Sequence, residues 1–554
     1  MPDAAGAGTG EPVRGARLTA STHRQWFCPR VGSPKAPARG LLSRAWLAAA
    51  LALAVLPLPA LAQPEANPGD AVPNVAAEIR SAVGGKIKAF YKTRGYWPFW
   101  VQDGALGPEA DRLIELLETA DLDGLKPADY DPDDLREIIA RAREGSAEAL
   151  AAAEVELSNT FADYVRDMRD VRRAPSVKMV YLDTELAPER LTRLAVLRTA
   201  GVAPSLADYL DTMGWMNPVY GQLRAALADY RAKWTELPQI TIPSGSILRA
   251  GVKDDRVPLL RQRLGLPEGT KFDKPLAAKL RAFQAAHGLP ADGIAGDATI
   301  AVLNREPAYY ERILRLNLDR ARLLPGTRKR HIIVDAAAAR LWMYEDGEVK
   351  GTMRVIVGKP TEPTPMLAGM MRYAVVNPYW NVPQDLVQHR IAQKVLDGAS
   401  FSDMGYEALS DWTAYAQVLD PAQIDWAAVA AGTRELRVRQ LPGKTNAMGR
   451  MKFMFPNDLG IYLHDTPDKE LFNEKERRFS SGCVRLEDAP RLAKWLFGKP
   501  LEAPSDVPEQ QVYLNAPMPV YITYLTAAPE KNGIAFREDA YGRDAMQVEQ
   551  LAGR

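Results

Sequence analysis

A cysteine and a histidine in the C-terminal third of the chain have the types and surroundings needed for nucleophilic chemistry. Cys483 follows the turn-forming stretch Ser480-Ser481-Gly482, and His464 ends a predicted strand. A thiol with its ordinary pKa of about 8.5 needs a base to form a thiolate near neutral pH, and an imidazole can serve as that base. Gly482 lets the backbone pass close to a substrate, so that amide groups of the turn, including that of Ser481, can face a developing oxyanion. The pattern predicts acyl chemistry, with Cys483 as nucleophile and His464 as general base.

Three neighbours of this pair have roles that the sequence leaves open. Tyr462 lies two residues before His464, so it shares a strand face with it and is expected to line the pocket. Asp465 is adjacent to His464 and points to the other face, so we do not assign it as the group that orients the imidazole. Arg485 has two interpretations: a substrate or catalytic contact, or a structural ion pair with Glu487 or another carboxylate.

A basic residue and a short apolar run near the N-terminus are typical of a secretory signal. Arg44 precedes the apolar stretch 45–56, and Ala60-Leu61-Ala62 supplies a small-x-small cleavage site. We therefore expect residues 1–62 to be a signal region cleaved after Ala62, with an uncleaved inner-membrane anchor as the alternative. Of the 2 cysteines in the chain, Cys28 lies upstream of that site. The exported chain would keep Cys483 as its single thiol and could form no internal disulfide.

The overall composition excludes some classes of partner without identifying the chemistry. A chain of 554 residues is too long for one hydrophobic core, so we expect several domains. Lys+Arg 70 and Asp+Glu 69 nearly balance, which leaves no field that would favour nucleic acid as a partner. No set of His, Cys, Asp and Glu residues shows metal-ligand spacing, so neither a metal site nor a metalloprotease is predicted.

The period of the apolar residues divides the rest of the chain into a helical part and a β-rich part. Helical spacing prevails from about residue 76 to 235, whereas strand alternation appears in 332–334 and 353–357. Residues 388–450 break the strand pattern with helical and irregular sequence, and we interpret them as an insertion that caps one edge. The expected segments are a linker at 63–75, a helical scaffold at 76–246, a small helical module at 247–306, a connecting helix at 307–327, a catalytic domain at 328–526 and a C-terminal tail at 527–554.

The small helical module resembles the three-helix peptidoglycan-binding module. The resemblance rests on a string of motif residues: Phe283-Gln284, Gly288-Leu289, Asp292-Gly293, Gly296 and Thr299. Most of them suit structural roles, because glycines allow a tight turn while Asp and Thr commonly cap turns and helices. The resemblance implies affinity for glycan, although it does not locate a binding pocket.

The catalytic segment resembles the YkuD-type L,D-transpeptidases, which carry a histidine followed by a [ST]-x-G-C-x-[RN] motif. That pattern is filled by His464, Ser480, Gly482, Cys483 and Arg485. The large Gram-negative branch of the family shares the Ser-Ser-Gly-Cys-Val-Arg string. It also shares the stretches 357–360, Thr364-Pro365 and 377–383. The resemblance implies a substrate pocket that includes Ser480, Tyr462, Arg485, Trp380 and Asn381.

The resemblance further implies a multidomain α+β protein: a helical scaffold, the peptidoglycan-binding module and a β-rich catalytic domain with a capping insertion. Its expected activity is the formation of 3–3 cross-links in peptidoglycan through a thioester on Cys483, with release of D-Ala. Stem peptides and glycan are the expected partners, and carbapenems the expected inhibitors. The family uses no metal or other cofactor. The signal sequence predicts a periplasmic location. The protein is also expected to be a monomer.

Two other functions fit the same residues. Hydrolysis of the thioester by water would make the protein an L,D-carboxypeptidase, because the same cysteine and histidine serve both reactions. A non-catalytic wall-binding protein would rely on the module and leave Cys483 without a role. A papain-like protease is disfavoured, since those enzymes place the cysteine before the histidine in sequence, the reverse of the order here. The acceptor and the group that orients His464 stay open.

Overall fold

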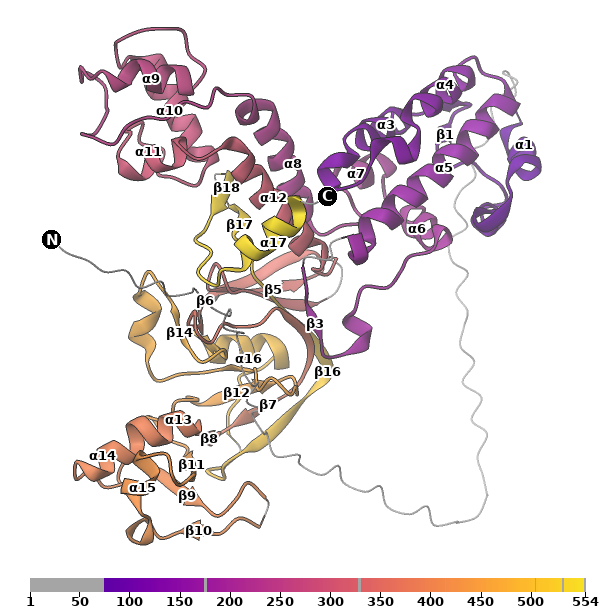
Figure 1. Ribbon diagram of the computed structural model, residues 1–554. Helices are drawn as coiled ribbons and strands as arrows, with labels where there is room; N and C mark the ends of the chain where they lie inside the picture. Colours follow the sequence, from indigo (N-terminus) through magenta and orange to yellow (C-terminus); the bar gives the residue numbers. More distant parts are fainter. Residues whose placement is uncertain are drawn as a thin grey trace, which may run out of the picture.

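The computed structural model describes residues 74–173, 177–326, 330–413, 415–503, 505–530 and 533–552. The signal region expected at 1–62 and nearly all of the linker expected at 63–75 lie outside these residues. Within the described ranges, no helix has the length and apolar character needed to cross a membrane. The fold is multidomain α+β, as the sequence predicts (Figure 1).

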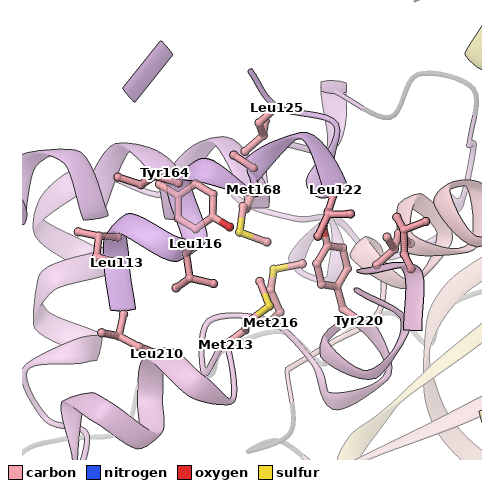
Figure 2. Packing of buried hydrophobic residues seen from close by; sticks show 14 of the residues in the cluster. Leu113, Leu116, Leu122, Leu125, Tyr164, Met168, Leu210, Met213, Met216 and Tyr220 are labelled. Atoms are coloured by element: carbon pink, nitrogen blue, oxygen red, sulfur yellow. The ribbon is translucent and has the colours of Figure 1, made fainter. Parts of the chain in front are cut away.

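The scaffold is built from helices whose apolar faces meet in one core. Ser146 begins the longest of them by accepting the amide of Ala149 at 3.1 Å. Figure 2 shows leucine, methionine and tyrosine side chains from several of these helices converging, including Leu113, Met168 and Leu210. The helices are α1 (Val75–Ala82), α2 (Lys88–Thr93), α3 (Glu109–Glu118), α4 (Pro132–Ala142), α5 (Ala147–Arg169), α6 (Arg193–Ala200), α7 (Leu206–Asp211) and α8 (Pro218–Tyr230).

The small module contains three helices, α9 (Arg256–Arg263), α10 (Lys274–Ala286) and α11 (Asp297–Leu303). Its motif residues are structural: the amide of Gln284 donates to Asp292 at 2.8 Å and accepts the N–H of Gly293 at 2.8 Å. The module shares a core with the scaffold, because the ring of Trp234 packs on Phe283 with centroids 5.5 Å apart. Helix α12 (Pro307–Arg322) then leads to the catalytic domain.

The catalytic domain is a sheet whose two ends meet. Its strands follow the order β12-β13-β15-β6-β5-β4-β16-β7-β3, and β12 also pairs with β7, so the strands between them close into a ring. Strand β14 pairs with β6 beside this ring. The bounds are β3 (Val180–Tyr181), β4 (His331–Asp335), β5 (Arg340–Glu345), β6 (Glu348–Gly358), β7 (Leu367–Val376), β12 (Met451–Met454), β13 (Leu463–His464), β14 (Arg478–Ser480), β15 (Val484–Leu486) and β16 (Gln510–Thr523).

The segment predicted as an insertion, 388–450, forms most of a small unit at the end of the catalytic domain away from the scaffold (Figure 1). This unit begins earlier than predicted, at residue 380. It has its own apolar cluster, which includes Val387, Ile391 and Val438. The sequence predicts helical and irregular structure here, and it misses a four-stranded sheet of order β10-β9-β11-β8. Two of these strands have two residues and two have four, so any alternation is too brief to stand out from the surrounding sequence. The elements are β8 (Trp380–Asn381), α13 (Gln384–Leu386), the π-helical turn η7 (Val387–Ala392), α14 (Gln393–Leu396), β9 (Tyr406–Leu409), β10 (Val418–Leu419), α15 (Trp426–Ala430) and β11 (Arg437–Gln440).

The C-terminal segment at 527–554, expected as a tail, is folded in its described residues, 527–530 and 533–552. It forms the hairpin β17 (Ala527–Glu530) and β18 (Gly533–Phe536), then helix α17 (Arg543–Ala552). The ring of Phe536 packs on Tyr310 of α12 at 5.1 Å, and Asp544 pairs with the buried Arg320 at 2.7 Å. Charged residues of this segment pair with residues more than two hundred positions earlier, as Asp544 does with Arg320 and Arg537 with Asp335. Local sequence patterns cannot predict such pairs.

The expected scaffold range, 76–246, is also interrupted. Strand β3 pairs in parallel with β7 of the catalytic sheet, and the N–H of Leu182 donates to Ala368 at 2.8 Å. Val177 and Met179, just before β3, are buried in the catalytic core. A piece of the helical part of the sequence therefore completes one edge of the catalytic sheet.

Candidate active site

Two neighbouring parallel strands bring the candidate residues to one face of the catalytic sheet. In the pairing of β13 with β15, Leu463 lies opposite Val484 and His464 lies opposite Arg485. Leu463 and Val484 are fully buried in the core. Because side chains alternate along a strand, His464 and Arg485 point to the other face. Cys483, directly before β15, comes to the same face.

The turn before Cys483 is held by the side chain of Ser480. The Ser480 hydroxyl donates to the Cys483 carbonyl at 2.6 Å and accepts the N–H of Gly482 at 3.2 Å. Gly482 has a φ of 109°, in the region that disfavours other residues. Ser480 is buried whereas Ser481 is exposed. Ser480, predicted to line the pocket, therefore acts within the turn as a brace.

A loop after β6 supports the same turn from behind. The hydroxyl of Thr364 accepts the N–H of Gly358 at 2.8 Å and donates to the carbonyl of Gly482 at 2.8 Å. The hydroxyl of Tyr541, in the C-terminal segment, donates to the carbonyl of Gly358 at 2.7 Å. Neither the bracing by Thr364 nor that by Tyr541 is predicted from the sequence, although the Thr364-Pro365 string marks the position.

His464 is buried, and its ring is oriented by the next residue. Its Nδ1 lies 2.6 Å from the backbone carbonyl of Asp465. A carbonyl only accepts, so Nδ1 carries the proton and Nε2 is left as the acceptor. The pKa of His464 is lowered to about 3, chiefly by burial and also by the charge of Arg485, while the bond to Asp465 opposes the shift. The imidazole is therefore neutral, in the tautomer that a general base needs.

Cys483 is partly exposed, and its thiol donates to the carbonyl of Gly460 at 3.3 Å. Desolvation raises the pKa of this thiol to about 11, and hydrogen bonds from Tyr462 together with the charge of Arg485 oppose the shift. Among the described residues, no hydrogen bond joins the thiol to His464. The resting pair is therefore a neutral thiol beside a neutral imidazole.

Arg485 has spare hydrogen-bonding capacity on the face that carries the thiol. Its nearest carboxylate is Asp468 at 3.5 Å, while Glu487 pairs instead with Arg354 at 2.5 Å. The suggested pairing with Glu487 is therefore wrong, because Arg354 of the neighbouring strand β6 occupies that carboxylate. The Nε of Arg485 is buried without a partner among the described residues. Burial lowers the pKa of Arg485, and the charge of Arg390 in the insertion adds to this.

The remaining predicted pocket residues fall into two groups. The ring of Tyr462 lies 5.7 Å from that of His464, so it belongs to the site. Trp380 and Asn381 form β8 and pair with β11 of the insertion, and Trp380 packs on the insertion's own core. The contacts of the described residues join neither of them to Cys483. Across the same residues, no group of three His, Cys, Asp or Glu side chains could hold a metal ion.

Comparisons with known proteins match three segments of the chain. Residues 329–513 match the YkuD family, described as the L,D-transpeptidase catalytic domain. Residues 260–303 match a peptidoglycan-binding domain, and residues 85–227 match a scaffold domain. These ranges overlap most of the catalytic sheet, the three-helix module and the scaffold helices, although the first range ends within β16 and leaves out β3.

A Haemophilus influenzae protein assigned by name to the L,D-transpeptidases is 35% identical over 239 residues, which is 42% of this chain and 48% of that protein. This chain thus matches about half the length of that relative. An L,D-transpeptidase structure from Mycobacterium smegmatis covers 36% of this chain and 59% of its own at 16% identity and a TM-score of 0.18. One from Stackebrandtia nassauensis covers 51% and 96% at 17% identity and a TM-score of 0.17. Scores this low carry no argument.

Proposed function

Because residues 329–513 are an L,D-transpeptidase catalytic domain, we propose that the protein forms 3–3 cross-links between peptidoglycan stem peptides through a thioester on Cys483. One observation carries this proposal. Cys483 and His464 project from paired parallel strands to the same face, and the His464 tautomer leaves Nε2 free to accept a proton. The large Gram-negative branch of the family fits this arrangement of domains.

In the first half-reaction, His464 takes the thiol proton as Cys483 attacks the carbonyl of the third stem residue, meso-diaminopimelate. Because the Gly482 N–H is bonded to the Ser480 hydroxyl, the backbone amide of Ser481 is the group of this turn that stabilises the oxyanion. The peptide bond to the terminal D-Ala then breaks, and His464 returns the proton to the departing amine. The products are a thioester on Cys483 and free D-Ala. Since the resting pair is neutral, proton transfer accompanies the attack on bound substrate.

In the second half-reaction, an amine of another stem attacks the thioester. His464 removes a proton from that amine and protonates the departing thiolate, which restores the neutral pair. Arg485, whose buried Nε has no partner among the described residues, is suited to a carboxylate of the stem. Water in place of the amine would give tripeptide, the product of an L,D-carboxypeptidase.

The peptidoglycan-binding domain at 260–303 supports the wall as the site of action. The module shares its core with the scaffold, so a module that binds glycan would keep the rest of the chain close to the wall. We propose a periplasmic location on the ground of this substrate, together with the signal expected from the sequence.

Incubation of the protein with disaccharide-tetrapeptide, followed by mass analysis, tests the function. We expect a cross-linked dimer and free D-Ala, and neither from Cys483→Ala. Tripeptide alone would replace the transferase with a carboxypeptidase. Equal product from Cys483→Ala would remove the thiol from the mechanism, and no product from either protein would favour a wall-binding role. A carbapenem should add its mass to the intact protein but not to Cys483→Ala.

A further inference from the structure

The side chain of Asp465 connects the insertion to the candidate base. Its carboxylate accepts the N–H of Arg450 at 2.9 Å and the ammonium of Lys469 at 2.7 Å. Its own N–H donates to the carbonyl of Met451 at 2.9 Å, and its carbonyl accepts from His464. Asp465 is 4% exposed, so its own groups are shielded from water, whereas the Lys469 side chain is 47% exposed.

The contact with the end of the insertion leaves no free space. Gly449 has a φ of 60°, and a Cβ added there would lie 2.5 Å from the Asp465 carboxyl carbon. Only a glycine therefore lets the chain leave the insertion against this carboxylate. A change in the path of Gly449 would displace Asp465.

The turn that precedes Gly449 is hydrogen-bonded to the chain at both ends of the insertion. Asn446 is fully buried, and its amide donates to the carbonyl of Pro378 at 3.1 Å and to that of Leu441 at 2.9 Å. The N–H of Gly449 in turn donates to the carbonyl of Asn446 at 2.8 Å. The chain entering the insertion, the chain leaving it and Asp465 are thus linked within one turn.

Lys469 extends the link to the strand of the nucleophile. Besides Asp465, its ammonium donates to the carbonyls of Leu486 at 3.2 Å and Glu487 at 2.9 Å, at the end of β15. The Asp465 carboxylate therefore contacts the exit of the insertion directly, through Arg450, and the end of β15 through Lys469. The backbone carbonyl of the same residue orients His464.

From these contacts we propose that Asp465 is a positioning residue whose carboxylate couples the placement of the insertion to the orientation of His464. The proposal rests on the proposed function, in which His464 is the base. Seating of the insertion at the Gly449–Arg450 exit fixes the Asp465 carbonyl, and this fixes the ring with Nε2 as acceptor. From the sequence, Asp465 is not expected to orient the imidazole, because its side chain faces away from His464. The structure gives it a role through its backbone.

The test compares Asp465→Asn and Gly449→Ala with wild type in the full-length protein. Asparagine keeps the volume but loses the ion pair with Lys469, and alanine at 449 pushes against the carboxylate. Since a displacement of about 1 Å can cost a hundredfold in rate, we expect kcat to fall ten- to a hundredfold in each variant, with KM within about twofold. The double variant should be no slower than the slower single one, because both act on one contact.

Gly405→Ala is the matched control. Gly405 also lies in the insertion at a positive φ of 75°, but an added Cβ there meets nothing within 4 Å. It shares the backbone strain of Gly449→Ala without the contact to Asp465. We expect its kcat to stay within about twofold of wild type. A loss as large as that of Gly449→Ala would assign the effect to strain and overturn the proposal.

A readout independent of turnover is the tautomer of His464, followed by ¹⁵N NMR of the imidazole. Wild type should show one neutral ring protonated on Nδ1, and both variants a mixture of tautomers. An unchanged ring in folded variants, or a kcat within twofold of wild type, would overturn the proposal. If neither variant folds, Lys469→Met is measured by the same two readouts. It removes the ion pair with Asp465, and it should fold because the Lys469 side chain is 47% exposed. If wild type forms no thioester, the proposed function fails, while the NMR comparison still tests Asp465.

Discussion

The hydroxyl of Thr364 and the carbonyl of Gly482 are joined by a 2.8 Å hydrogen bond between two loops that are distant in sequence. Thr364 is fully buried, and the same hydroxyl accepts the N–H of Gly358. One side chain therefore satisfies a donor at the end of β6 and an acceptor in the turn before Cys483. This places the turn relative to the sheet without using a residue of the motif.

Replacing Thr364 with valine should loosen the turn. Valine has nearly the same shape but leaves the Gly358 N–H and the Gly482 carbonyl unpaired, at a cost of about 1–3 kcal/mol for each buried group. We expect carbapenem acylation of Cys483 to slow at least about tenfold, measured by mass spectrometry over time. Thr361→Val, at an exposed position of the same loop, is the control. Equal rates in the two variants would contradict the bracing role.

The two serines before Gly482 should differ sharply when each is changed to alanine. Ser480→Ala removes the bonds to the Cys483 carbonyl and the Gly482 N–H. We expect the acylation rate to fall about tenfold or more, because the amides of the turn lose their alignment. Ser481→Ala removes only an exposed hydroxyl and should stay within about threefold. A larger effect at Ser481 would show that its side chain, and not only its amide, acts in the reaction.

The sequence predicts this site well where a local pattern carries the information. The strand ending at His464 and the turn before Cys483 are both found. What it misses depends on contacts across the fold. The link from Asp465 to Arg450, and the bracing of Gly358 by Tyr541, join residues whose pairing only the closed sheet decides. The same reason accounts for β3, which belongs to the catalytic sheet but lies within helical sequence.

The reactivity of Cys483 should depend steeply on pH in the absence of substrate. With the thiol pKa raised to about 11 and that of His464 lowered to about 3, the two groups do not form a thiolate–imidazolium pair at rest. Alkylation by iodoacetamide should accelerate about tenfold for each pH unit between 6 and 9, measured by intact mass. A rate that is flat across this range would indicate a preformed ion pair. Cys483→Ser is the control. It has no thiol among the described residues, so its mass change measures alkylation at other sites.

Acid should destabilise the protein through two buried neutral histidines. Burial lowers the pKa of His287 to about 4 and that of His464 to about 3, both below the ordinary 6.5. The unfolded chain then binds these protons first. The stabilisation is complete above pH 6.5 and is lost as pH falls towards 4, by at most about 1.4 kcal/mol per pH unit for each histidine.

Urea unfolding at pH 7 and pH 5 measures this loss. His287→Gln should reduce the difference between the two pH values, because glutamine has no proton to bind and can still meet Tyr230, which lies 3.2 Å from the histidine Nε2. An unchanged difference in this variant would assign the acid sensitivity to other groups.

Removing one hydroxyl in the C-terminal segment should weaken the site from a distance. Tyr541→Phe deletes the bond to the Gly358 carbonyl, which is worth about 1 kcal/mol. We expect acylation of Cys483 to slow by about three- to tenfold. Tyr513→Phe, at a tyrosine that is 66% exposed, is the matched control and should leave the rate unchanged. Equal rates in the two variants would show that the loop is held without Tyr541.

The bracing of Gly358 by Tyr541 also sets an order of events during synthesis. The ribosome makes the Ser480–Arg485 motif before it reaches Tyr541, and an exported chain emerges in the same direction. The nucleophile is therefore present in the growing chain before the residue that steadies its turn. A chain truncated between Arg485 and Tyr541 would contain every residue of the motif. It would still lack the hydrogen bond from Tyr541 to Gly358 that supports the turn. For gene truncations in this protein, retention of the cysteine motif alone does not predict an active product.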